Sequence, residues 1–451
     1  MTRGDPSQVA SQADQWGTAF PDFLKSQTPD PVWRDFREEA FRSFQQQGLP
    51  HTRQEDWRHT PLQALRDLGP FQPISASDGS LAALENLPVA HPEWPQAVFI
   101  DGKLDRERSS LPASSVGIEI VDLEQALEDA STRETLLGRI GKLADPRTDA
   151  LTALSSAFMQ GGSLVRIREG CVVDQPIHLV FMWTEKGTLR CPRILVLAEP
   201  ASQATALVEH ISHESHASLV NSVSEIFIED GAHLEWLPVQ HLAPSALHVS
   251  NLQAQIAQSG RLGLHLLSLS GHFIRNNIGV DLIAPNAQVE LNSLFLAGEG
   301  QLADHHTEIR HKAPHARSQQ IHKAVLAGNA RGVFRGLIHV DPDTQKTESS
   351  LSSSSLLLSK RARIDSEPQL KIFTDDVTCS HGSTVGQLDE EALFYLRTRG
   401  IGSEHARQIL TRAFTEEICR RLPSDHLRNF VSSLVSTELR ALNSISAEVP
   451  G

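Results

Sequence analysis

The stretch GAHLEWLPVQHLAPSALHVSNLQAQIAQSGRLGLHLLSLSGHFIRNNIGVDLIAPNAQVEL, residues 231–291, decides the fold. It repeats a short pattern in which a turn residue and a small residue precede a polar and then a hydrophobic residue. The copies are GAHLEW at Gly231, SGRLGL at Ser259 and NAQVEL at Asn286, and no helical pattern lies between them. Such a repeat, at steps of 27 to 28 residues, is typical of a β-helix, in which each coil buries its face on the next coil.

Two weaker copies follow this stretch. HARSQQ at His315 is a degraded copy 29 residues after Asn286, and RARIDS at Arg361 comes 46 residues after His315. The irregular last interval leaves one coil unplaced. On the residues alone, a β-sandwich therefore remains an alternative to the β-helix.

The flanking sequence divides the chain into four parts. Residues 1–95 have mostly helical patterns, and residues 96–160 mix short strands with helices, including one over 149–159 that we expect to cover an end of the core. Residues 161–388 are strand after strand, with no long helical pattern. Residues 389–451 become helical again, with a helix at 389–399 and an amphipathic hairpin broken at Pro423.

Composition excludes several classes of function. A formal charge of −14 argues against nucleic acid as the main partner, because phosphates need clustered Lys and Arg. Four cysteines without a close pair make no disulfide framework, so we expect a reduced, cytoplasmic setting. We find no signal-peptide pattern, and no apolar run reaches the roughly 18 residues of a membrane helix, so no membrane partner is expected.

The segment KIFTDDVTCSHGSTVGQLDEEALFYLRTRGIG, residues 371–402, carries the candidate chemistry. Cys379 and His381 lie two positions apart, so in a strand both side chains share one face. A thiolate and a neutral imidazole suit iron and other borderline metals, but two ligands do not complete a closed site. A buried cysteine beside a hydrogen-bonded histidine is the plainer interpretation of the residues alone. Asp375 and Asp376 are either acid/base groups or turn residues, and the turn is favoured.

Other motifs are less specific. The histidines His305, His306, His311, His315 and His322 suggest either a transition-metal groove or polar positions along the coils, and their spacing matches no closed site. SSLSSSSLLLSKRAR contains no G-x-S-x-G nucleophile elbow. No Walker A and no G-x-G-x-x-G sequence occurs, so nucleotide hydrolysis is not expected of this chain.

The segment DDVTCSHGSTVGQLDEEALFYLRTRGI resembles the signature of the SufD family, subunits of the SUF iron–sulfur cluster assembly scaffold. Four further blocks resemble the same family: EDWRHTPL from Glu55, PRILVLAE from Pro192, ARGVFRGLIHV from Ala330, and LLLSKRARIDSEPQLKI from Leu356. The resemblance implies a mainly β fold, with a right-handed parallel β-helix core between N-terminal and C-terminal helical domains. One departure is SLSSSS, which stands where such chains usually carry Asn or Gln.

The resemblance also implies a non-catalytic scaffold with two protein partners. His381 would lie at an interface with SufB, beside Cys379, where a transient iron–sulfur cluster is shared between the subunits; no tightly bound cofactor is expected. The SufC ATPase would dock on the C-terminal helices, through the apolar stripe Ala406, Ile409, Leu410, Ala413, Phe414 and Ile418. A homodimer of the isolated subunit is also conceivable.

Two alternatives come from other proteins with the same expected core. One is a β-helix enzyme acting on polysaccharide through Asp375, Asp376 and His381. Its weaknesses are an aromatic content of only 5% and the lack of a secretion pattern. The other is the paralogous SufB family, which tends to carry several cysteines and a different run after the helix-entry motif.

Overall fold

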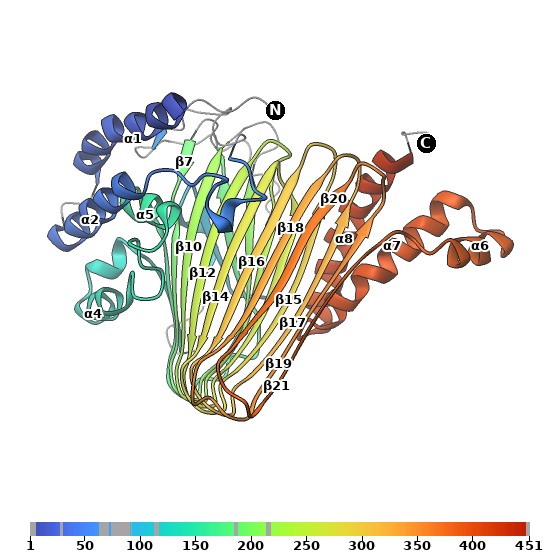
Figure 1. Ribbon diagram of the computed structural model, residues 1–451. Helices are drawn as coiled ribbons and strands as arrows, with labels where there is room; N and C mark the ends of the chain where they lie inside the picture. The colour runs from blue at the N-terminus through green and yellow to red at the C-terminus, as the bar shows by residue number, and fades with distance from the viewer. Residues whose placement is uncertain are drawn as a thin grey trace.

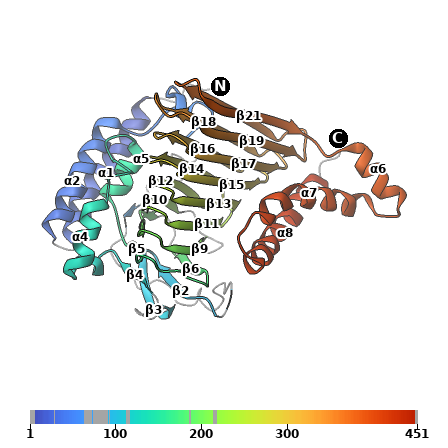
Figure 2. The same cartoon turned by 90° about the horizontal axis from the view of Figure 1, so that it is seen from below.

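The computed structural model describes residues 6–27, 30–62, 72–73, 91, 93–111, 117–184, 188–212 and 218–447. Parallel strands stack into two sheets that face each other across a packed interior, with helices on the two opposite flanks (Figures 1 and 2). The predicted mainly β fold with a parallel solenoid core and helices at both ends of the chain is confirmed. Among the described residues, no helix combines the length and apolar character that crossing a bilayer requires.

Two sheets, here named sheet A and sheet B, form the solenoid. Sheet A contains, in spatial order, β20 (Arg363–Ile372), β18 (Arg331–Val340), β16 (Leu302–His311), β14 (Phe273–Leu282), β12 (Leu247–Ile256), β10 (Leu219–Ile228), β8 (Arg193–Ala198), β5 (Gly162–Ile167) and β4 (Ile118–Asp122); β7 (Thr188–Arg190) also pairs with β10, and β1 (Gln72–Pro73) pairs with β7. Sheet B contains, in spatial order, β21 (Val377–Gly386), β19 (Thr347–Leu357), β17 (Arg317–Leu326), β15 (Gln288–Ala297), β13 (Arg261–Ser270), β11 (His233–His241), β9 (Gln203–Ser212), β6 (Ile177–Trp183), β2 (Gln96–Ile100) and β3 (Lys103–Ser110).

The sequence repeat marks the turn that leads from sheet A into sheet B. Gly231, Ser259, Asn286 and His315 all have positive φ, between 55° and 67°. Each sits one coil from the next, and the amides donate along the stack, as from Ser259 N–H to the Pro285 carbonyl at 3.1 Å. Asn and Gly tolerate this left-handed backbone best, which explains why turn residues recur there.

The unplaced coil begins at Lys346, which has φ 58° and precedes β19. No turn-forming residue type marks that position. RARIDS was wrongly grouped with the other copies, because it leads into β20 of sheet A and not into a strand of sheet B. With Lys346 in place of Arg361 as the next copy, the irregular interval of 46 residues after His315 disappears.

An N-terminal lobe covers part of the outer face of sheet A. It contains α1 (Pro6–Ser26), α2 (Pro31–Gln47), the 3₁₀ turns η1 (Glu55–Trp57) and η4 (Gln125–Leu127), α4 (Ala130–Arg139) and α5 (Ala150–Ala157). The helix expected over residues 149–159 forms, but the prediction that it covers an end of the core is wrong. It packs between α2 and the outer face of β10, and the end is instead closed by β3 and β4, which run antiparallel to β2 and β5.

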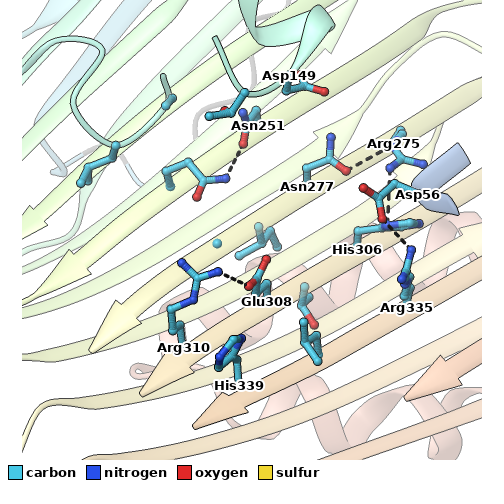
Figure 3. A pocket seen from close by; sticks show the side chains of 18 of the residues that line it. Asp56, Asp149, Asn251, Arg275, Asn277, His306, Glu308, Arg310, Arg335 and His339 are labelled. Carbon is cyan, nitrogen blue, oxygen red and sulfur yellow. Dashed lines mark hydrogen bonds and ion pairs between the residues drawn. The ribbon is translucent and has the colours of Figure 1, made fainter. Parts of the chain in front are cut away.

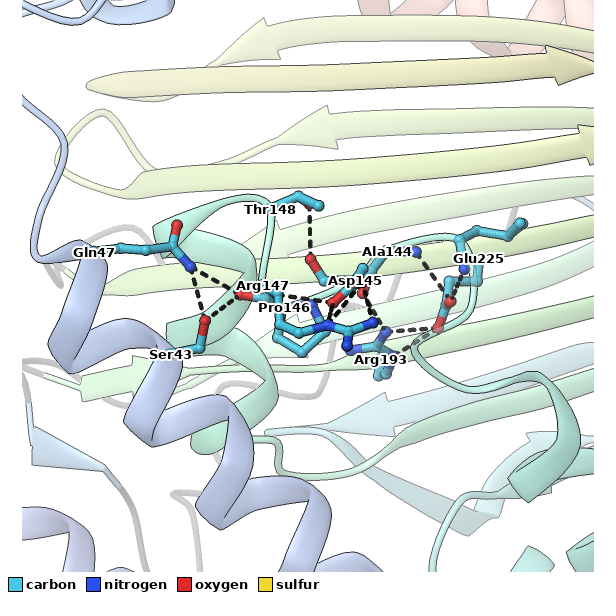
Figure 4. Close-up of polar contacts among 10 residues, drawn as sticks. Ser43, Gln47, Ala144, Asp145, Pro146, Arg147, Thr148, Arg193 and Glu225 are labelled. Atoms are coloured by element: carbon cyan, nitrogen blue, oxygen red, sulfur yellow. Dashed lines mark hydrogen bonds and ion pairs between the residues drawn. The ribbon is translucent and has the colours of Figure 1, made fainter.

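A buried ion pair fastens the loop between α4 and α5 to sheet A (Figure 4). Arg193 on β8 and Glu225 on β10 lie 2.6 Å apart, and both side chains are fully buried. The Glu225 carboxylate accepts the backbone N–H groups of Gly141, Leu143 and Ala144. One carboxylate therefore satisfies a guanidinium and a loop backbone at once, as burial of a charge demands.

Three helices follow the solenoid: α6 (Glu390–Thr398), α7 (Ser403–Arg420) and α8 (Asp425–Ala447). The hairpin of α7 and α8 packs on the outer face of sheet B, over β13, β15 and β17. Lys323 pairs with Glu417 at 2.7 Å and His241 with Glu438 at 3.1 Å, so polar contacts supplement the apolar seam. Helix α6 projects away from the solenoid (Figure 2).

Candidate functional site at the open end of the solenoid

The last coil, made of β20 and β21, forms what we call the open end. Each of these strands is the last in its sheet, so among the residues that the structure describes no strand lies beside its outer edge. Side chains in β20 and β21 are half-buried or exposed, whereas those of the preceding coils are largely buried. The interior that is closed elsewhere is therefore accessible here, and Figure 2 shows it opposite to the end closed by β3.

Cys379 and His381 both face the interior at this open end. They lie in register with Ser349 and Leu351 of β19, whose side chains are buried inside the solenoid. Both residues lie in β21, so their side chains share one face as predicted, and the two residues are about 7 Å apart along the strand. No further coil covers them in the described part of the chain, so His381 is exposed and Cys379 is half-buried.

The surroundings of Cys379 are apolar. Its side chain packs against the cluster that contains Ile338, Val340 and Leu351. Burial in this setting raises the pKa of the Cys379 thiol, since the thiolate loses hydration there. The isolated chain therefore holds a protonated thiol at neutral pH, which must lose its proton to bind a metal.

Three serine hydroxyls line the same opening. Ser366 on β20 lies 2.8 Å from Ser383 on β21 and 3.4 Å from Ser353 on β19. In the segment SLSSSS, residues 350–355, side chains alternate between the two faces of β19, so some serine hydroxyls face the interior and others face outward. Sequence reasoning missed Ser366 and Ser383, although counting every second residue from Cys379 and His381 would have reached Ser383.

The two free edges differ. In β20, Arg363 and Phe373 donate their backbone N–H groups to β18. The backbone N–H and C=O groups of the even-numbered residues therefore point away from β18, toward the free edge. Pro368 occupies one of those outward positions and has no N–H to offer. In β21 the outward backbone groups belong to Cys379, His381 and Ser383, and no proline interrupts them. The edge of β21 is therefore the more complete template for another strand.

The two acids of the polysaccharide alternative lie apart from His381. Asp375 and Asp376 form the turn that enters β21, where Val377 donates its N–H to the Asp375 carbonyl. His381 is five residues further along the strand than Asp376, about 16 Å away. The polysaccharide alternative needs these three side chains in one site, and the structure does not bring them together.

The histidine cluster does not form a groove. His305, His311 and His322 face the interior and hydrogen-bond Ser268, Ser318 and Ser293, whereas His306 faces out and His315 lies in a turn. Burial lowers the pKa of His305 to about 3 and that of His311 to about 4, so both are neutral. Within the described residues, no group of three or more His, Cys, Asp or Glu side chains is arranged to hold a metal.

The stripe proposed on α7 splits between two environments. Ala406 and Ile418 are fully buried against the solenoid and α8, and Leu410 and Phe414 are half-buried. Only Ile409 and Ala413 of the six are exposed. A second apolar surface, which sequence reasoning missed, lies on α6, where Phe394 is 68% and Tyr395 is 57% exposed. Together with Leu396 and Leu410 they line a shallow apolar depression.

A polar groove of about 660 Å³ crosses the outer face of sheet A (Figure 3). Its walls are the η1 segment and the loop before α5, and its floor is formed by outward side chains of β12 to β20. Arg310 pairs with Glu308 at 2.6 Å, and Arg335 pairs with Glu55 and Asp56. The charges of these arginines are thus already neutralised, and the groove identifies no class of ligand.

Comparison with known proteins gives two family matches. The model for the SufBD core domain of SUF system FeS cluster assembly matches residues 181–414, and that for the SufBD protein N-terminal region matches residues 20–179. Similar curated proteins include the iron–sulfur cluster assembly protein SufD of Escherichia coli, 28% identical over 87% of this chain and 90% of its own length. A SufBD family protein of Synechocystis is 29% identical over 92% of each chain, and the chloroplastic protein ABCI7 of Arabidopsis thaliana is 26% identical over 86% of this chain and 82% of its own. The resemblance to SufD drawn from the segment around Cys379 and His381 is confirmed, and this chain belongs to the SufBD family.

Proposed function

We propose that this chain is a scaffold subunit of SUF iron–sulfur cluster assembly, which pairs with a SufB-type subunit at its open end. The observation that carries the proposal is the position of the half-buried Cys379 and the exposed His381 on β21, whose edge offers their own backbone N–H and C=O groups to a partner strand. Strand addition at such an edge supplies main-chain hydrogen bonds across the seam. The same event would cover both side chains.

The cluster is cargo at this seam and not a resident group. Cys379 and His381 supply one soft and one borderline donor, which fit iron, and they leave further coordination positions to the partner. Because the pKa of the Cys379 thiol is raised, iron must displace the thiol proton before Cys379 can bind it. This chain's contribution is thus to hold two donor residues, about 7 Å apart along the strand, at an opening that the partner closes.

The C-terminal helices are the proposed docking element for the SufC ATPase. Ala406 and Ile418 already anchor α7 to the solenoid, so the exposed surface of Phe394, Tyr395 and Ile409 is the better candidate for contact. Exposed aromatic side chains on a projecting helix are the usual anchors of such interfaces. We therefore propose that SufC docks on α6 and the adjoining side of α7.

Co-expression with SufB and SufC, followed by anaerobic iron and sulfide analysis, tests the proposal. His381→Ala should leave the complex assembled and lower its iron and sulfide content severalfold. His51→Ala, an exposed histidine of the N-terminal lobe, is the matched control. Phe394→Asp should abolish retention of SufC without loss of SufB. Unchanged cluster content in His381→Ala would remove that residue from the site, and failure to co-purify SufB would refute the scaffold role.

A further inference from the structure

The block EDWRHTPL contacts strands of sheet A that lie far from it in the sequence. Its residues Glu55–Thr60 begin with η1 of the N-terminal lobe and lie on the outer face of sheet A. Four strands are each contacted by this short segment, namely β14 through Trp57, β16 through Thr60, β18 through Glu55 and Asp56, and β20 through His59.

The first two contacts are a buried anchor. The Arg275 guanidinium lies 3.8 Å from the Trp57 ring centroid and pairs with Asp304, which is fully buried. The Thr60 hydroxyl donates to the same carboxylate at 2.5 Å. Burial would raise the pKa of Asp304, yet Arg275 and His306 hold it well below its usual range. The carboxylate is thus a fixed anion to which the segment is tied.

The other contacts reach the open end. Arg335 on β18 binds Glu55 at 2.5 Å and Asp56 at 2.6 Å. His59 reaches β20, with Nε2 3.0 Å from Glu367 and Nδ1 3.5 Å from Asp365. Apolar contacts of the lobe extend along sheet A to Leu302 at the start of β16. Within the described residues, the polar contacts of Glu55–Thr60 reach further than these apolar contacts, as far as β20, the last strand of sheet A.

We propose that residues Glu55–Thr60 form a clasp that holds β20 against β18, so that the N-terminal lobe sets how well the open end receives a second subunit. An edge strand has a neighbour on one side only, and its ends fray unless side chains fix it. The hydrogen bond between His59 and Glu367 holds β20 from the outer face. β20 borders the opening next to β21, where Ser366 lies 2.8 Å from Ser383, so a fixed β20 leaves less conformational entropy to lose when a partner closes that opening along β21. His59 is therefore a positioning residue, and the part about the partner rests on the proposed function.

Hydrogen exchange of the full-length chain, without any partner, tests the clasp. His59→Ala should speed exchange of the β20 amides that donate to β18, those of Asp365, Glu367 and Gln369, by roughly threefold to tenfold, the scale of one hydrogen bond. Exchange in β10 and β12 should not change. His59→Gln, which keeps an N–H donor for Glu367, should restore part of the protection, and His51→Ala should have no effect. Equal β20 exchange in His59→Ala and the unmodified chain would overturn the clasp.

Binding to an isolated SufB-type subunit tests the second half. His59→Ala should raise the dissociation constant severalfold, and His59→Gln should raise it less. Faster β20 exchange with unchanged affinity would overturn the influence on the partner. If the unmodified chain binds no such subunit, the proposed function fails, while the exchange result still decides whether the clasp exists.

Discussion

Arg193 and Glu225 form an ion pair of 2.6 Å whose side chains are 1% and 0% exposed. Glu225 also accepts three backbone N–H groups from the loop that joins α4 to α5, and Arg193 donates to the Ser156 hydroxyl on α5 at 2.9 Å. The pair thus ties the N-terminal lobe to β8 and β10, far from the open end. Its loss should cost stability while leaving the proposed site intact.

Glu225→Ala is therefore expected to lower the free energy of unfolding by about 3–5 kcal/mol, because it leaves the Arg193 charge buried without its partner. Urea unfolding followed by circular dichroism measures the change. Glu348→Ala is the matched control, since Glu348 pairs with Arg317 at 3.3 Å in an exposed setting. That control should cost less than about 1 kcal/mol. Similar losses in the two variants would show that the buried pair does not fasten the lobe.

Alkylation should report the state of the Cys379 thiol. Burial raises its pKa, so iodoacetamide should react more slowly at pH 8 than with an unhindered cysteine peptide, and faster as the pH increases. Cys191 and Cys419 are buried and should react later still. Peptide mass spectrometry distinguishes the sites, with Cys379→Ser as the blank. Modification of Cys379 at the rate of a free peptide thiol would contradict the packing of its side chain beside Leu351 and Val340.

Proline substitution should separate pairing at the edge from folding. The Ser383 N–H points to the free edge of β21, so Ser383→Pro should leave the solenoid folded but block a partner strand, as Pro368 does on β20. Thr384→Pro is the matched control, because its N–H points toward β19 and its loss should destabilise the last coil. Co-purification with SufB and thermal melts give the two readouts. Normal pairing by Ser383→Pro would exclude strand addition at β21.

Much of the solenoid could be predicted because its turns obey a local rule. Gly231 and Asn286 adopt the left-handed backbone at little cost, so their turns can be recognised in the sequence. Lys346 adopts the same conformation without being a turn-forming residue type, and the hydrogen bond from its N–H to the Asp376 carbonyl belongs to the coil stack. Such a position is set by its neighbours and leaves no mark in the sequence.

The candidate site could likewise be predicted only in part from the sequence. Period two places Cys379 and His381 on one face, but the sequence does not say that no coil follows to cover that face. The stripe on α7 shows the converse. Ala406 and Ile418 have the spacing of a docking surface, yet they pack on this chain's own sheet B. An amphipathic pattern identifies a buried face without saying what buries it.

The contact between α8 and sheet B should depend on pH through His241. The hydrogen bond from His241 to Glu438, at 3.1 Å, raises the pKa of the imidazole, with burial opposing and Glu209 adding to the effect. A folded-state pKa above the unfolded value means that this stabilisation is complete at pH values below about 6.5 and is lost as the pH rises through the folded-state value. Glu438→Gln should remove the dependence. Urea unfolding at several pH values between 6 and 9 should therefore give a difference between the two proteins that shrinks as the pH rises, by no more than about 1 kcal/mol for so accessible a pair. Other histidines titrate equally in both proteins and cancel in that difference. A constant difference across the range would mean that His241 carries no charge in its contact with α8.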